Sequence, residues 1–270
     1  MTSATGFMVE NRTLKAYAIM AVIYLYAPIV ILLAFSFNNS IFIAFPFKGL
    51  TLKWYEAMAA NTQLHKALWN SIVVGAIASV VATMIATLAA KAVTRHGMPG
   101  RHAMVSLVSL PMVMPEIILG IALLVLLFSL GVTLSLATII LGHIIVCTPY
   151  ALVIMISRFQ GYDPSYEEAS LDLGEGALST FWRVTLPLVW PGVASSLLLT
   201  FLISFDDFVV TFFVTGTEQT LPIFIWSQLR FADRLPGVLA LGSLIIVAST
   251  VLLVIVEWLR RRGEGALRTM

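Results

Sequence analysis

Hydrophobic positions in this chain gather into six long apolar stretches, which are separated by shorter polar segments. Each stretch holds about 20 residues or more, the length at which a helix crosses the hydrocarbon core of a bilayer. A lone segment in lipid can satisfy its backbone groups only internally, so we expect each stretch to be helical. The stretches cover residues 16–37, 68–93, 103–128, 135–157, 192–214 and 238–259. The pattern therefore predicts an all-α, polytopic membrane protein with six transmembrane helices in a single domain, residues 1–270.

The composition supports this class and excludes several others. Of the 270 residues, 59% are hydrophobic and 11% are charged, whereas a soluble domain carries about 25% charged residues. The net charge of +2 is too small to indicate nucleic-acid binding. Cys147 is the only cysteine, so an internal disulfide is excluded, and we expect a buried, inert thiol without a metal cluster. Residues 1–10 are polar, so no cleavable signal peptide is expected.

The placement of lysine and arginine predicts the orientation, because cytoplasmic loops carry the excess of these residues. One side of the membrane would hold Arg12, Lys15, Arg95, Arg101, Arg158, Arg183, Arg260, Arg261, Arg262 and Arg268, with Lys91 reaching towards it. The other side would hold only Lys48, Lys53, Lys66, Arg230 and Arg234. We therefore expect the first side to be cytoplasmic, with both termini and the long polar loop 158–190 on that side.

Proline falls inside several of the predicted spans, where it removes a backbone hydrogen bond and kinks the helix. The prolines concerned are Pro28, Pro111, Pro115 and Pro149. They can reflect irregular packing in a helical bundle. Alternatively, Pro111 and Pro115 can bend the third helix around a central pathway.

The segment 38–67, between the first two stretches, is long and mixed in character. Trp54 and Tyr55 suit the membrane interface, where aromatic rings sit half in water. We expect an amphipathic helix on the outer surface, which either anchors at the interface or contacts an external binding protein.

The loop 158–190 has the residues of a helical hairpin. Ser165 follows a proline and precedes Glu168 by three residues, which predicts a helix start with a capping box. Gly174 suits a left-handed residue that ends this helix. A second short helix is expected over residues 177–184, ending before Pro187.

The same loop resembles the EAA motif of bacterial ABC-importer permeases. That motif is Glu-Ala-Ala, three residues, Gly, nine residues, an aliphatic residue, one residue and Leu-Pro. The matching positions are Glu168, Ala169, Ser170, Gly174, Val184, Leu186 and Pro187. Ser170 replaces the second alanine and Val184 the commoner isoleucine. The resemblance implies a type I ABC importer permease fold, in which these positions couple the permease to an ATPase.

The resemblance also implies the partners. These are a dimer of cytoplasmic ATP-binding subunits, a second permease subunit (a homologue or a second copy) and a periplasmic substrate-binding protein. The carboxylate of Glu168 can pair with an arginine of the ATPase, or it can cap its own helix, and the two roles can coexist. No phosphate loop of the form GxxxxGKS/T occurs, so ATP hydrolysis would belong to the partner. The chain is expected to be no enzyme and to hold no cofactor or metal.

The likeness extends over nearly the whole chain. The stretches concerned are 26–28, 36–38, 111–116, 142–147, 204–210, 213–216 and 220–222, and they look similar to spermidine/putrescine-type permeases of the bacterial inner membrane. This implies import of putrescine, spermidine or a related small cation. Sister groups that import ferric ions, opines or phosphonates remain alternatives. A free-standing ion-coupled carrier or channel is the alternative from another class, and it would not need the EAA-like loop.

Four ionisable residues lie within predicted spans, where an uncompensated charge costs about 2.5–3.5 kcal/mol or more. They are Glu116, His143, Asp206 and Asp207, and counting residues at about 1.5 Å each places them near one depth. Such acidic residues can attract a cationic substrate, with Phe205 and Phe208 lining its route by cation–π contact. Alternatively, the aspartates pair with backbone donors at a helix break. A catalytic aspartate pair is disfavoured, because adjacent carboxylates on one helix cannot share a proton.

Overall fold

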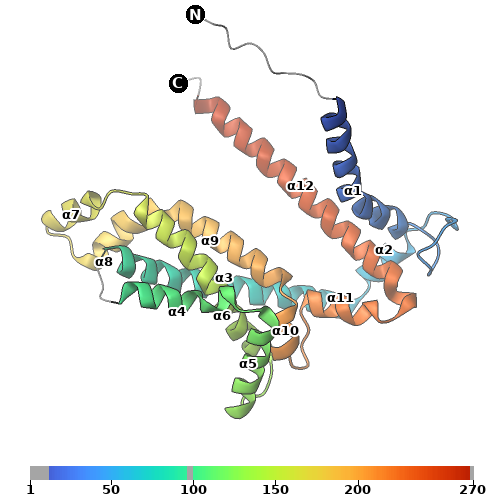
Figure 1. Ribbon diagram of the computed structural model, residues 1–270, viewed down its shortest axis with the longest axis horizontal. Coiled ribbons are helices and arrows are strands. Elements are labelled where there is room, and N and C mark those ends of the chain that lie inside the picture. Colours follow the sequence, from blue (N-terminus) through green and yellow to red (C-terminus); the bar gives the residue numbers. More distant parts are fainter. Residues whose placement is uncertain (1–11, 96–99, 268–270) are drawn as a thin grey trace, which may run out of the picture. The chain divides into compact units, whose positions relative to one another are not determined.

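The structure, a computed structural model, describes residues 12–95 and 100–267, with side chains described over 14–95 and 100–251. Predictions made for residues 1–10 and for Arg268 lie outside the described residues, as do the side chains of Arg12, Arg260, Arg261 and Arg262. The described chain consists of helices, their connections and one isolated β-bridge (Figure 1). Contacts divide it into two compact units, residues 1–61 with 227–270 and residues 62–226.

Among the described residues, five helices are long and apolar enough to cross a membrane. They cover Leu14–Ser36, Thr62–Arg95, Leu136–Gln160, Ala177–Asp206 and Ala232–Val251. A sixth span results if the bent pair Arg101–Val113 and Glu116–Ser129 is counted as one. The predicted all-helical membrane fold is therefore confirmed.

The larger unit is built around three helices that pack against one another. They are α3 (Thr62–Arg95), α6 (Leu136–Gln160) and α9 (Leu186–Asp206). The face that α3 buries carries alanine at every fourth position, which are Ala78, Ala82, Ala86 and Ala90, all fully buried. Small residues at helical spacing let helix backbones approach closely, which is how membrane helices gain van der Waals contact. This spacing explains the tight core formed with Ala151, Leu152 and Met155 of α6.

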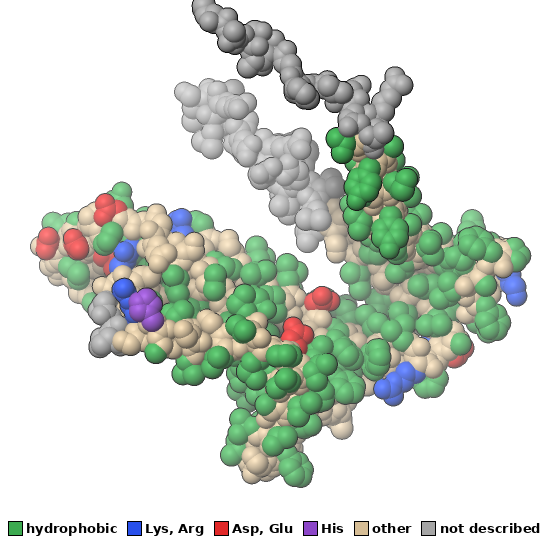
Figure 2. All heavy atoms as spheres, in the orientation of Figure 1, with side chains coloured by type: hydrophobic (Ala, Val, Ile, Leu, Met, Phe, Trp, Pro, Cys, Tyr) green, Lys and Arg blue, Asp and Glu red, His purple; other side chains and the backbone are tan. Residues whose placement is uncertain are grey.

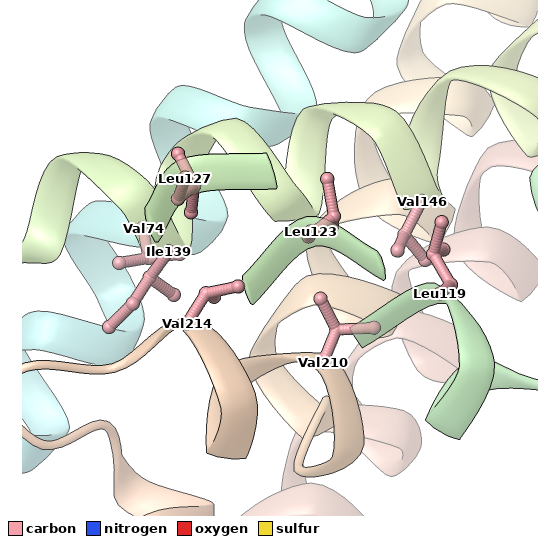
Figure 3. Close-up of a cluster of buried hydrophobic side chains, with 8 residues drawn as sticks. All are labelled: Val74, Leu119, Leu123, Leu127, Ile139, Val146, Val210 and Val214. Atoms are coloured by element: carbon pink, nitrogen blue, oxygen red, sulfur yellow. The ribbon is translucent and has the colours of Figure 1, made fainter. Parts of the chain in front are cut away.

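A second core lies where two shorter helices pack against α3 and α6. Figure 3 shows α5 (Glu116–Ser129) and α10 (Val209–Val214) facing each other across this cluster. Each helix contributes residues spaced four apart, so the contacts fall on one face of each. The members are Val74, Leu119, Leu123, Leu127, Ile139, Val146, Val210 and Val214.

The third apolar stretch is broken, so its prediction as one helix is wrong. It forms α4 (Arg101–Val113) and α5, which are bent by 104° at residues 114–115. The reason is Pro115, which cannot donate a backbone hydrogen bond and forces the preceding residue, Met114, out of the helical region to φ −74°, ψ 142°. A bend of this helix at Pro111 and Pro115 was one of the two alternatives. Pro111, in contrast, lies inside α4 without ending it.

The fifth stretch is also displaced from its predicted range of 192–214. The helix α9 begins at Leu186 and ends at Asp206, and Asp207 has an extended backbone with ψ 120°. A short helix, α10, then continues the chain over six residues. The predicted span continues past this break because the residues on both sides of it are hydrophobic, and hydrophobicity alone does not mark where the helix ends.

The smaller unit consists of α1 (Arg12–Ser36), α2 (Lys53–Ala59), η2 (Ala232–Arg234) and α12 (Leu235–Leu267). α12 packs against both α1 and α2. The Tyr55 hydroxyl is hydrogen-bonded to Ser36 and to Ser243, each at 2.7 Å. The indole Nε1 of Trp54 donates to the Asn38 carbonyl at 2.9 Å. The helix expected in segment 38–67 is present, but Trp54 and Tyr55 direct their polar atoms into the unit.

Gly216 offers a direct test of the packing in the larger unit, residues 62–226. A Cβ at this position would lie 2.2 Å from the Leu134 carbonyl oxygen, and backbone atoms cannot move aside as a flexible side chain can. We expect Gly216→Ala to destabilise the fold by about 1–3 kcal/mol, which is typical of overpacking. Thermal unfolding of the purified protein in detergent measures this effect. Gly237→Ala is the control, because a Cβ there meets nothing within 4 Å, and equal melting temperatures for both variants would contradict the packing.

Candidate functional site

The first candidate site is the hairpin formed by α7 (Ser165–Asp172) and α8 (Ala177–Thr180). Its start differs from the prediction, because the capping box between Ser165 and Glu168 does not form and Pro164 holds the N-cap position. Instead, Asp163 Oδ1 accepts the backbone N–H of Ser165 at 3.0 Å. This backbone hydrogen bond lowers the pKa of Asp163 below its ordinary value. The Asp163 carboxylate thus accepts a backbone hydrogen bond at the helix start, where the Ser165 side chain was expected to do so.

The turn of the hairpin is formed by Gly174, as predicted. Its φ is +89°, and its backbone N–H donates to the Leu171 carbonyl at 2.9 Å. The N–H of Glu175 reaches back to the Ser170 carbonyl at 3.2 Å, which completes a glycine-based helix end. A Cβ on Gly174 would meet nothing within 4 Å, so backbone conformation and not space demands glycine here.

Ser170, the residue that departs from the EAA pattern, is buried inside the hairpin. Its hydroxyl is 3.0 Å from the Thr180 hydroxyl, which is also buried. This hydrogen bond joins the two arms of the hairpin. Ser170 therefore replaces the methyl group of an alanine with a polar contact that has its partner in the same loop.

The outer surface of the hairpin combines acidic and apolar side chains (Figure 2). Glu168 and Ala169 are exposed. Leu173 and Leu178 are 86% and 73% exposed. Neighbouring exposed leucines at the end of a hairpin are typical of a surface that another protein covers.

The hairpin continues directly into α9, so the predicted helix end before Pro187 is wrong. Residues Phe181–Thr185 form a π-helical turn, in which the N–H of Leu186 donates to the Phe181 carbonyl. Pro187 then lies in the first turn of α9, where a missing N–H costs least. A π-helical turn is wider than an α-helical turn, so the ring of Pro187 does not clash with the backbone carbonyl of residue 183. Leu186 and Pro187 therefore link the hairpin to a spanning helix.

Glu167, which lies outside the EAA motif, makes the contacts at the root of the hairpin. The root is the place where the hairpin joins the spanning helices. The Oε1 of Glu167 accepts hydrogen bonds from the Tyr162 hydroxyl and, at 2.7 Å, from Thr185, and its Oε2 lies 3.7 Å from Lys91 Nζ. Burial raises the pKa of Glu167, but these donors and the charges of Lys91 and Arg95 outweigh burial and hold the pKa below its usual value of 4.5. The carboxylate is therefore ionised at neutral pH and joins α3, the end of α6 and the π-turn.

Two arginines reinforce this root. Arg95 donates to the carbonyls of Phe159 and Tyr162 at 2.8 and 3.0 Å, and its guanidinium lies 4.3 Å from the Tyr162 ring centre. Arg158 donates to the Leu188 carbonyl. A Cβ on Gly192 would lie 2.6 Å from Arg158 Cγ, so this glycine leaves the space through which Arg158 passes. From the sequence alone, both arginines indicate only the orientation in the membrane.

The second candidate site is a buried polar cluster at the break between α9 and α10. His143 of α6 lies 2.6 Å from Ser204 through Nδ1 and 2.7 Å from Thr211 through Nε2. Its Nε2 is also 3.2 Å from Asp207 Oδ2. The exposed fractions of the His143 and Asp207 side chains are 1% and 7%. Burial on this scale requires that every polar atom find a partner.

Asp207 uses its carboxylate to begin α10. Oδ2 accepts the N–H and the hydroxyl of Thr211, both at 2.8 Å, and Oδ1 accepts the N–H of Val210 at 3.4 Å. The two N–H groups are backbone donors that a helix start leaves free. The geometry therefore favours, for Asp207, the alternative in which the carboxylate pairs with donors at a helix break.

The other residues expected along a substrate pathway lie outside this cluster. Asp206 and Glu116 are exposed. Phe208 is half-buried, with its ring 5.3 Å from Trp226 and 5.6 Å from Phe212. Phe205 stacks on Phe201 at 5.8 Å. The structure thus brings His143 together with Asp207 and leaves two carboxylates accessible. In the described part of the chain, no three His, Cys, Asp or Glu side chains are placed to hold a metal ion.

Comparison with known proteins agrees with this fold. Residues 82–264 match the family described as the binding-protein-dependent transport system inner membrane component, and the chain belongs to this family. It is a permease of an ABC importer and a multi-pass membrane protein, which confirms the resemblance found in its sequence.

Particular relatives can be named. The chain is 34% identical to the spermidine/putrescine transport system permease protein PotC of Haemophilus influenzae, over 93% of this chain and 97% of that protein. It is 35% identical to PotC of Escherichia coli K12 (88% and 90%) and 33% identical to the putrescine transport system permease protein PotI of the same strain (89% and 88%). A solved bacterial ABC transporter involved in alginate import has a chain of similar fold, with TM-score 0.70, 18% identity and coverage of 94% and 98%.

The adjacent aspartates allow a matched test of the buried cluster. We expect Asp207→Asn to lower the melting temperature and the yield of folded protein, because breaking a buried, hydrogen-bonded pair costs about 3–5 kcal/mol. Asp206→Asn changes an exposed residue and should stay within about 0.5 kcal/mol of the parent. Thermal unfolding and size-exclusion chromatography in detergent measure both effects. A normal melting temperature for Asp207→Asn would show that its carboxylate does not hold the break.

Proposed function

We propose that this chain is the permease subunit of an ATP-driven importer for polyamines such as putrescine and spermidine. The observation that carries this proposal is its identity of 33–35%, over about nine-tenths of the chain, to permeases that are named for these solutes. The chain itself would form the pathway and hydrolyse no ATP. A soluble binding protein would deliver the polyamine, and a second permease subunit would complete the pore.

The α7–α8 hairpin is the proposed docking element for the ATP-binding subunits. Its supporting features are the exposed Leu173 and Leu178, which offer apolar contact, and the exposed Glu168, which offers a carboxylate to a basic partner residue. The excess of arginine on the same side of the membrane supports a cytoplasmic hairpin, and both termini would then be cytoplasmic as well. The chain would then lie in the bacterial inner membrane.

Glu167 would make the hairpin move as one body with the spans. A docking element transmits motion only if its root is stiff, and here one ionised carboxylate joins α3, the end of α6 and the π-turn before α9. Hydrogen bonds to a charged group contribute about 1.5–3 kcal/mol. Because the folded pKa of Glu167 is lowered, this stabilisation is present above pH 4.5 and is lost as the pH falls through the folded value.

For the solute itself, we propose that the exposed carboxylates of Asp206 and Glu116 attract the cation. Both lie in helices that are otherwise apolar, where negative potential acts over a longer range than in water. The rings of Phe205 and Phe208 would contact the methylene stem and ammonium groups of a polyamine. His143 and Asp207 would hold the helix break that positions these groups.

Coupling can be tested by comparing two carboxylates of the same loop. Glu167 pairs with Lys91 in a largely buried site, whereas Glu175 pairs with Arg183 at the surface at 3.1 Å. We expect Glu167→Gln to lower polyamine uptake per ATP hydrolysed about tenfold, since it loosens the root by about 1.5 kcal/mol or more. Glu175→Gln should leave that ratio unchanged, because exposed ion pairs contribute little. The assay is uptake and phosphate release in vesicles that contain the complete transporter.

An equal ratio for both glutamate variants would show that the root does not carry coupling. A fall in protein yield alone would not produce the expected result, because the ratio is taken per ATP hydrolysed.

The substrate class is tested with the purified complete complex in lipid. Loaded binding protein should stimulate its ATPase when putrescine or spermidine is supplied. Phosphonates and short acidic oligosaccharides should have no effect, because Asp206 and Glu116 repel anions. Stimulation by an anionic solute and none by either polyamine would overturn the proposed substrate and leave the permease class intact.

A further inference from the structure

His143 is enclosed by protein, and its two ring nitrogens have different partners. Nδ1 lies 2.6 Å from the Ser204 hydroxyl, whereas Nε2 lies 2.7 Å from the Thr211 hydroxyl and 3.2 Å from Asp207 Oδ2. The exposed fractions of His143, Ser204 and Thr211 are 1%, 3% and 0%. Polar atoms buried to this extent have to satisfy one another. The protons of the ring can therefore be assigned from the partners.

The Thr211 hydroxyl determines the role of Nε2. This hydroxyl has one proton, and its acceptors are Asp207 Oδ2 at 2.8 Å and the Asp207 carbonyl at 3.2 Å. Oδ2 also accepts the Thr211 N–H, as an ionised carboxylate does. Because the hydroxyl proton is directed to Asp207, the Thr211 oxygen can meet Nε2 only as an acceptor. Nε2 therefore carries a proton. Without it, Nε2 and Asp207 Oδ2 would face each other as two acceptors.

The Ser204 hydroxyl determines the role of Nδ1. A serine inside a helix commonly donates to the carbonyl four residues earlier. Here that carbonyl belongs to Thr200 and accepts the Cys147 thiol at 3.4 Å. In the described part of the chain, the Ser204 hydroxyl is hydrogen-bonded only to Nδ1, so its proton goes there and Nδ1 is an unprotonated acceptor. A second ring proton would leave the serine proton buried without an acceptor, which is unfavourable.

We propose that His143 is a neutral imidazole with its proton on Nε2, and that the negative charge of Asp207 is therefore left uncompensated inside the membrane. A ring with both nitrogens protonated would cancel this charge. Among the described residues, no lysine or arginine forms an ion pair with Asp207. The helices that carry the cluster, α6, α9 and α10, contain one such residue, Arg158. It lies 15 residues from His143, about 22 Å along α6.

The uncompensated charge acts on a cation in the pathway, and this step rests on the proposed import of polyamines. Asp206, the residue before Asp207, is exposed at the end of α9, and consecutive Cα atoms are about 3.8 Å apart. A cation at Asp206 therefore lies near Asp207 without touching it. In a medium of low dielectric constant, this second negative charge adds to the attraction. His143 is thus a positioning residue, which gives Asp207 a donor without adding a positive charge and so favours solutes of higher charge.

The protonation of His143 is tested by solid-state NMR of the complete transporter in lipid, with isotope-labelled histidine in this chain only. The chain has four histidines, and replacing His65, His96 and His102 with glutamine leaves His143 alone. His65 and His102 are exposed and lie outside the cluster. At neutral pH we expect a protonated Nε2 and an unprotonated Nδ1. Two protonated nitrogens, or a proton on Nδ1 alone, would overturn the proposal.

The effect on the solute is tested with two substitutions of His143. Lysine adds a positive charge beside Asp207, whereas glutamine is neutral and offers a donor and an acceptor, as the imidazole does. The readout is the ratio of spermidine uptake to putrescine uptake, since spermidine carries three ammonium groups and putrescine two. We expect His143→Lys to lower this ratio about threefold or more, because the additional ammonium group loses its share of the attraction. His143→Gln should lower the uptake of both solutes by the same factor and leave the ratio unchanged.

An unchanged ratio in His143→Lys, or an equal fall of the ratio in both variants, would contradict the proposal. A histidine that only supports the fold would affect the two solutes alike, whatever their charge. The NMR spectrum decides the charge of His143 even where a substitution prevents folding. It also separates this inference from the proposed substrate, because it involves no polyamine: the single proton on Nε2 is expected even if another solute is carried.

Discussion

A membrane span can break only where some other group satisfies the backbone that the break sets free, and in this protein one buried carboxylate does so. Asp207 accepts the N–H of Thr211 at 2.8 Å and lies 3.2 Å from His143, so it both ends one helix and starts the next. Without it, the apolar residues on each side would favour a continuous helix. Asp206, at the last position of α9, would then no longer lie at a helix end.

The hairpin also contains a pair of adjacent acidic residues with different surroundings. Glu167 and Glu168 are adjacent, as Asp206 and Asp207 are, and in each pair one carboxylate is buried among donors while the other is exposed. Neighbouring residues on a helix point about 100° apart, so two adjacent acids can serve two surfaces at once. The buried member stabilises the local fold. Its neighbour is left free for a ligand or a partner.

Sequence reasoning recovered the parts that depend on local chemistry or on long apolar runs. The four stretches that form unbroken spanning helices and the left-handed Gly174 belong here, with the bend at Pro115 as one of two alternatives, since apolarity, ring sterics and φ preference act within a few residues. The break at Asp207 was only one of two alternatives from the sequence, because His143 lies 64 positions earlier and meets Asp207 only in three dimensions. Sequence reasoning preferred Glu168 to Glu167 for the same reason. The motif marks the exposed residue, whereas Lys91 and Thr185 decide the buried one.

The two candidate sites lie at opposite ends of one helix. α9 runs without interruption from Leu186, where the π-turn of the hairpin ends, to Asp206, a length of about 31 Å. Its packing against α3 and α6 makes it a rigid element, and rigid elements with two discrete positions carry coupling between distant sites. Under the proposed docking of an ATPase on the hairpin, Glu167 and the π-turn would pass its motion to the start of α9. The far end, where Asp206 is exposed beside the His143–Asp207 cluster, would then move with it.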